Sequence, residues 1–161
     1  MAKDETAAGR SLRLAKVPHS FHEIDVPKDR KTSALEMARA SGLHPARLFK
    51  TLIVTTSEAK LATAVVPANT DLDRKALAKH LGTKRIDLAD QKFAEKITGY
   101  KAGAISPVGQ KKLLLSFLDE SAQAFDTIYV SGGRWGLELE IAPSDLIKAM
   151  KGTICAIALP Y

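Results

Sequence analysis

A chain of 161 residues is long enough for one domain with a hydrophobic core and too short for two domains of ordinary size. Its 45% hydrophobic and 26% charged residues exclude a disordered chain, and its longest apolar runs are too short to cross a bilayer. The net charge of +6 admits nucleic acid as a partner without requiring one.

The first half of the chain shows short periodic segments separated by turn residues. Ser33 and Glu36 have the spacing of a capping box, which predicts a helix that ends near Gly42. Two β-rich runs then follow each other closely enough to form a hairpin. The expected elements are a helix at 5–15, a strand at 20–26, a helix at 34–42, a helical turn at 44–49, and a hairpin of strands 50–56 and 60–67.

The second half of the chain alternates irregularly between strands and helices. Asn69 or Asp71 is expected to cap a helix that stops at Gly82, and Pro143 is expected to open the last helix. Because several strands are joined by short turns, we expect one α/β domain over 1–161 with a mixed sheet. The other expected elements are a strand at 85–89, a helix at 90–99, a loop at 100–112, a strand at 113–119, a short helix or turn at 120–126, strands at 127–131 and 136–142, and a final strand at 153–159.

The common motifs for a nucleotide cofactor, a metal or a protein nucleophile do not occur. G-x-x-x-x-G-K-[ST], G-x-G-x-x-G and G-x-S-x-G are all missing, and the four histidines form no H-E-x-x-H pattern. His19 and His22 are expected at the surface, and the single cysteine, Cys155, is expected to be a small buried residue. We therefore expect no cofactor and no metal.

The first twenty residues contain no continuous apolar stretch typical of a secretory signal, so the cytoplasm is the expected location.

Two features allow a functional interpretation beside a plain structural one. The stretch "SGGRWG" at 131–136 leads into an alternating strand, which favours a hairpin turn over a phosphate loop at a helix N-terminus. Lys50 stands at the head of an apolar strand. It is either an ordinary surface lysine or a cation at the mouth of a cleft that holds a phosphate or carboxylate.

Several stretches together resemble one protein family. They are "LFKTLIV", "LATAVVPANTDLDRKALAKHLGTKRIDLAD", "TGYKAGAISPVGQKK", "FDTIYVSGGRWGLELEIAPSDL" and the closing "AIA". In this order and spacing they are similar to the YbaK/EbsC family of aminoacyl-tRNA deacylases, which is related to the editing domain of bacterial prolyl-tRNA synthetase. The resemblance runs from about residue 43 to residue 157.

The resemblance implies a fold, a reaction and partners. The fold would be a mixed, partly barrel-like β-sheet surrounded by short helices. The activity would be trans-editing: hydrolysis of the ester that joins cysteine to tRNA(Pro), and in some members to tRNA(Cys). In such enzymes the thiol of the bound cysteine is thought to attack its own ester carbonyl, which would explain the missing nucleophile. The implied partners are mischarged tRNA(Pro) and, in some members, prolyl-tRNA synthetase.

The resemblance also implies site residues. Lys50 matches a lysine that holds the substrate at the 3′ end of the tRNA, and Thr51 matches a threonine that lines the pocket. Gly103 matches a glycine whose backbone approaches the aminoacyl ester. Ser131 and Gly132 match the start of the family's "SGG" turn.

Three positions depart from the family pattern. Glu138 replaces a pocket aspartate, Val26 falls near a pocket tyrosine, and Ser33 falls near a pocket phenylalanine. A longer acidic side chain and fewer aromatic residues in the pocket leave open which amino acid is removed, because discrimination between small side chains rests on few contacts. Deacylation of another small amino acid, such as alanine, and a non-catalytic module that binds tRNA or a synthetase both remain as alternatives.

Overall fold

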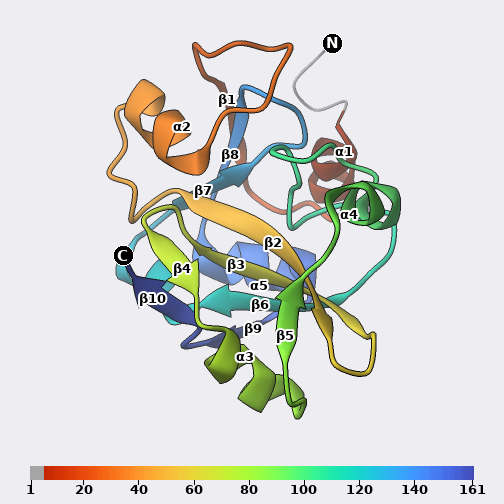
Figure 1. Cartoon of the computed structure of the whole chain (residues 1–161). Helices are drawn as coiled ribbons and strands as arrows, with labels where there is room; N and C mark the ends of the chain where they lie inside the picture. Colours follow the sequence, from red (N-terminus) through yellow and green to blue (C-terminus); the bar gives the residue numbers. More distant parts are fainter. Residues whose placement is uncertain (1–5) are drawn as a thin grey trace.

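The computed structural model describes residues 6–161, and Figure 1 shows their arrangement. Position 5, the expected start of the first helix, lies outside these residues. The described helices are α1 (Ala7–Leu14), α2 (Ala34–Ser41), α3 (Arg74–Leu81), α4 (Gln91–Thr98), α5 (Pro143–Met150) and the 3-10 helix η2 (Glu120–Ala124). The strands are β1 (Ser20–Glu23), β2 (Phe49–Thr56), β3 (Leu61–Pro67), β4 (Thr70–Leu72), β5 (Ile86–Leu88), β6 (Leu115–Asp119), β7 (Ile128–Ser131), β8 (Leu137–Ile141), β9 (Thr153–Cys155) and β10 (Ala158–Pro160).

Helix ends are set by local capping. The Ser33 hydroxyl accepts the Glu36 N–H at 3.1 Å and begins α2, which ends at Gly42 in the left-handed conformation, as the sequence predicts. The cap expected at Asn69 or Asp71 is wrong, because Asp73 accepts the Ala76 N–H at 3.0 Å. The expected cap Asp71 instead belongs to β4, which pairs with β10.

The larger sheet has the strand order β5-β2-β3-β6-β9. The hairpin of β2 and β3 is confirmed and antiparallel, whereas β6 and β9 continue the sheet in the parallel direction. The mixed sheet is thereby confirmed.

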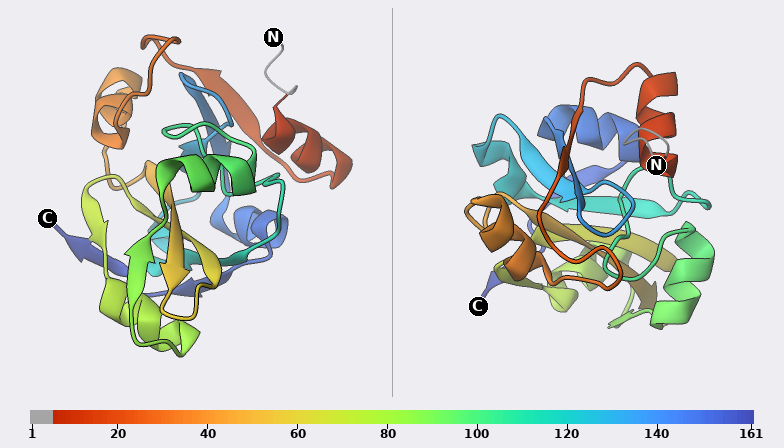
Figure 2. Two further views of the ribbon diagram at one scale, coloured as in Figure 1. Left: turned by 45° about the vertical axis from the view of Figure 1, so that its right-hand side comes forward. Right: turned by 90° about the horizontal axis from the view of Figure 1, so that it is seen from above.

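A second sheet, in the order β1-β8-β7, lies across the start of β2. β7 and β8 form the expected hairpin, in which Ser131 pairs with Glu138. A parallel bridge between Leu48 and Tyr129 joins the two sheets, and a hydrophobic core that includes Phe49 fills the space between them. The sheets curve toward each other without closing into a barrel in the described part of the chain (Figure 2).

Two further expectations about elements were wrong. Residues 153–159 form two strands, because the chain breaks where the Ile157 N–H donates to the Asp119 carboxylate at 2.9 Å. Residues 45–47 form a turn without a helix, Leu48 makes the isolated bridge to Tyr129, and β2 starts at Phe49. Cys155 is buried, as expected, and only 7% of its surface is exposed.

Candidate active site

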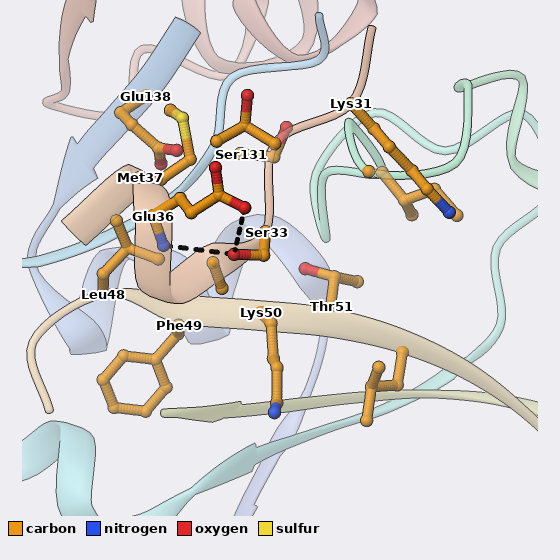
Figure 3. Close-up of a pocket in the computed structure, with 15 residues that line it drawn as sticks. Lys31, Ser33, Glu36, Met37, Leu48, Phe49, Lys50, Thr51, Ser131 and Glu138 are labelled. Atoms are coloured by element: carbon orange, nitrogen blue, oxygen red, sulfur yellow. Dashed lines mark hydrogen bonds between the residues drawn. The ribbon is translucent and has the colours of Figure 1, made fainter. Parts of the chain in front are cut away.

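A cavity of about 490 Å³ opens between α2 and the two sheets. Its walls come from the segment 31–37, the start of β2 at 48–52, the loop at 103–105, and the β7–β8 hairpin. Figure 3 shows α2 on one side of this space, β2 below it, and Ser131 and Glu138 at its upper end. Segments far apart in the sequence therefore meet at one concave site.

Lys50 and Thr51 are neighbours on β2, and their side chains point to opposite faces of the strand (Figure 3). Successive strand residues alternate between faces, and in Figure 3 Thr51 points up toward Ser131 while Lys50 points away from it. The Lys50 ammonium donates to the Tyr161 hydroxyl at 3.2 Å and lies 5.4 Å from the centre of that ring. Lys50 lines both the active-site cavity and an adjoining one, so its ammonium stands at the border between them.

Glu138 lies at the inner end of the cavity. Only 5% of this residue is exposed, although β8 alternates between apolar and acidic residues. Burial raises the pKa of its carboxyl from 4.5 to about 8, so the group is protonated at neutral pH. Two residues further along, Glu140 accepts from His22 at 2.9 Å and from Thr127 at 2.6 Å and does not line the cavity.

Three buried polar atoms around this cavity have no hydrogen-bond partner among residues 6–161. They are Thr32 Oγ1, Thr51 Oγ1 and Glu138 Oε2. A buried polar atom without a partner costs about 1–3 kcal/mol, and native proteins keep few of them. Their convergence on one space indicates that the cavity is shaped for a polar ligand.

Gly103 is held in a conformation that favours glycine. Its φ is +82°, and a Cβ at this position would lie 2.5 Å from Lys31 Cβ. The loop is fixed beside the hairpin by Trp135, whose indole N–H donates to the Ala102 carbonyl at 3.0 Å. The backbone of Gly103 therefore borders the cavity at a point where a side chain would push the wall aside.

The structure brings six of the eight expected site residues to the cavity. Val26 lies outside it and packs against the cluster that contains Met37 and Leu48. Gly132 also lies outside, where a Cβ would be 2.8 Å from the Leu137 side chain. The six lining residues are Ser33, Lys50, Thr51, Gly103, Ser131 and Glu138.

Sequence reasoning missed Thr32 and Met37 as lining residues. Thr32 follows a polar connection that carries no motif, and Met37 has the ordinary pattern of a helix core residue. Only the packing of α2 over β2 shows that both face the cavity. A sequence signal of the kind used above could not have found them.

The described residues hold no group of three or more His, Cys, Asp or Glu side chains placed to bind a metal ion. Burial and the nearby acids Asp119 and Glu120 raise the pKa of the Cys155 thiol to about 11, and this thiol does not line the cavity. No described helix is long and apolar enough to cross a membrane.

Comparisons with known proteins agree on one family. A family model described as the aminoacyl-tRNA editing domain matches residues 28–149. EbsC of Enterococcus faecalis, a protein named as a deacylase of Cys-tRNA(Pro) and Cys-tRNA(Cys), is 35% identical over 155 residues, which cover 96% of this chain and 94% of EbsC. A proline–tRNA ligase of Desulforamulus reducens is 30% identical over 93 residues, which cover 58% of this chain and 16% of the ligase.

Solved structures show the same fold. One described as a trans-editing enzyme for prolyl-tRNA synthetase superposes with a TM-score of 0.83 at 18% identity, over 99% of this chain and 98% of the other. At 18% sequence identity this similarity shows a shared fold only.

Proposed function

The chain belongs to the aminoacyl-tRNA editing domain family, and from that premise we propose that it removes mischarged cysteine from tRNA(Pro) in trans. The bond that breaks is the ester between the amino acid and the terminal ribose of the tRNA. The proposed location is the cytoplasm, and the proposed partners are tRNA(Pro) and prolyl-tRNA synthetase. The resemblance to EbsC supports cysteine as the amino acid.

The observation that carries this proposal is the set of unpartnered polar atoms inside the cavity. An aminoacyl ester presents an α-ammonium group, a carbonyl oxygen and an ester oxygen, all of which need partners when they leave water. Thr32, Thr51 and Glu138 offer buried oxygens without partners in the described structure. When the α-ammonium lies next to Glu138, its charge is expected to lower the pKa of that carboxyl and ionise it.

The cavity offers no activated nucleophile from the described residues. The Ser33 hydroxyl caps α2 and contacts the Glu36 carboxylate at 3.2 Å, and the Ser131 hydroxyl accepts the Gly133 N–H at 3.2 Å. No histidine lines this space, so neither hydroxyl has a neighbouring imidazole base. This arrangement favours a nucleophile supplied by the substrate.

In the proposed step the cysteine thiol attacks its own ester carbonyl. A carbon–sulfur bond forms, the bond from the carbonyl carbon to the ribose oxygen breaks, and the thiol proton ends on that ribose oxygen as a hydroxyl. The released cyclic thioester then reacts with water to give free cysteine. The protein contributes position and dipoles, with the Gly103 backbone at the ester and the Lys50 ammonium at the 3′ end of the tRNA.

The test charges tRNA(Pro) separately with cysteine, alanine and proline and follows ester loss with and without the protein. We expect rapid loss of the cysteine ester only, and a large decrease in its rate with Lys50→Ala. Loss of the alanine ester at the same rate would overturn thiol attack as the sole route. Stable esters in all three cases, with tRNA still bound, would show a non-catalytic binding module.

A further inference from the structure

A second cavity, of about 360 Å³, lies beside the candidate active site. Its lining includes the cations Lys28, Lys101 and Arg134, the aromatic rings of Tyr100 and Trp135, and no carboxylate. Its volume is within the range of about 300–1,000 Å³ common for small-molecule sites. Figure 2 shows where the three segments that supply these residues meet, near the turn of the β7–β8 hairpin.

Each positive side chain of this second cavity has a contact with a neighbouring group. The Lys28 ammonium donates to the Ile24 carbonyl, and the Lys101 ammonium lies 5.3 Å from the centre of the Trp135 ring. Arg134 uses one terminal nitrogen to bind Glu23 at 2.6 Å. Its Nε is buried and has no partner among the described residues, so part of the guanidinium remains available for an acceptor.

The two cavities share a wall. A small recess between them is lined by Gly103 and Glu138, which also line the active-site cavity, and by Arg134 and Trp135, which also line the second cavity. When the ester lies at Gly103, which lines both the first cavity and the recess, the attached nucleoside is next to the second cavity. Lys50 lines neither the recess nor the second cavity, so it holds the substrate from another side of the first cavity.

We propose that the second cavity binds the terminal nucleotide of the single-stranded acceptor end of tRNA, with the base on the Trp135 ring and the phosphate among Lys28, Lys101 and Arg134. This inference rests on the proposed function, because it assumes an ester-linked nucleoside in the neighbouring site. Aromatic rings that stack bases beside cations that neutralise phosphates are the general chemistry of single-strand binding. Stacking of the base requires the exposed Lys101 side chain, whose ammonium lies over the Trp135 ring, to leave that ring face.

Trp135 is the chain's single tryptophan, so its fluorescence reports on this cavity. The probes are a single-stranded RNA that ends in CCA and carries no amino acid, and the same RNA without its terminal adenosine. We expect the complete RNA to quench Trp135 emission and the shortened RNA to leave the emission nearly unchanged. Unchanged emission at concentrations where anisotropy shows that the complete RNA is bound would overturn the proposal.

Variants separate stacking from charge. Trp135→Ala should weaken binding of the complete RNA by about 5-fold to 150-fold, measured by anisotropy. Trp135→Ala also removes the hydrogen bond from the indole to the Ala102 carbonyl, so its effect could be structural. Lys28→Gln tests the phosphate contact and leaves that hydrogen bond in place. We expect Lys28→Gln to lower the slope of log affinity against log salt by about 0.7, as for one phosphate contact on a single strand. Lys79→Gln, on the exposed surface of α3, is the matched control and should leave that slope unchanged.

Ester loss from Cys-tRNA(Pro), measured on the same samples, distinguishes this proposal from the proposed function. Active protein with unresponsive Trp135 emission would overturn the nucleotide site alone. Quenching by the complete RNA without ester loss would overturn the proposed activity and support the nucleotide site.

Discussion

At the scale of single residues, Glu138 is the most unusual group of the site. It is 5% exposed and carries an oxygen without a hydrogen-bond partner among the described residues. Glu140, two residues further along the same strand, is hydrogen-bonded by Thr127. Burying a neutral carboxyl costs less free energy than burying a carboxylate. Desolvation accordingly raises the pKa of Glu138 to about 8. The Glu138 carboxyl therefore carries a proton that an ammonium group bound beside it would displace.

Glu138 should make the free energy of unfolding depend on pH. Between pH 4.5, its ordinary pKa, and about pH 8, the carboxyl is protonated when folded and ionised when unfolded. Stability must then fall as pH rises through this window, by at most about 1.4 kcal/mol per unit from this group. Glu138→Gln lacks the titration, so its advantage over the natural chain should grow with pH and level off above 8. Denaturant unfolding of both proteins from pH 5 to pH 9 measures this, and parallel curves would contradict it.

Gly103 and Gly82 form a matched pair of left-handed glycines. Their φ angles are +82° and +66°, but a Cβ would collide with Lys31 only at Gly103 and would meet nothing within 4 Å at Gly82. We expect Gly82→Ala to cost about 1–2 kcal/mol of stability, the usual strain of this conformation, with ester hydrolysis unchanged. Gly103→Ala should cost at least as much and also lower the deacylation rate. Equal activity of the two variants would show that the Gly103 loop is merely structural.

At the scale of elements, β2 and α2 define the cavity, and the sequence predicted both. Their local signals are strong: a capping box and a terminal glycine for α2, and a β-rich hairpin for β2 and β3. β4 was missed, and β10 was not separated from β9, because β4 and β10 are stabilised by pairing with each other across the chain. Local pattern carries no information about such pairing, so the cap of α3 was misplaced for the same reason.

The cap of α2 links stability to the site. The Ser33 hydroxyl both caps the helix and lines the cavity, whereas the Asp90 carboxylate caps α4 at 3.2 Å and lies away from it. Ser33→Ala and Asp90→Ala should each cost about 0.5–2 kcal/mol of unfolding free energy. Only Ser33→Ala should also raise KM for the aminoacyl-tRNA. Steady-state kinetics beside thermal unfolding checks this, and an equal KM in both variants would place α2 outside substrate binding.

At the scale of the whole molecule, the site depends on segments that only the fold brings together. Family resemblance alone pointed to Gly103 and Glu138, whereas Lys50 was also a candidate from its place at the head of an apolar strand; all three line the cavity. It did not reveal Thr32, the protonated state of Glu138, or the contact of Lys50 with Tyr161. These follow from packing between β2, α2, the hairpin and the end of the chain, which no short motif encodes.

The central claim is that this chain removes cysteine from tRNA without a nucleophile of its own. The most direct test is the single-turnover rate of ester loss from tRNA(Pro) charged with cysteine or with serine, which differ by one atom. Both side chains fit the same space, but only the thiol is a strong nucleophile near neutral pH. We predict rapid loss of the cysteine ester and a serine ester that remains near its spontaneous rate. Equal rates for the two esters, or a stable cysteine ester, would contradict the claim.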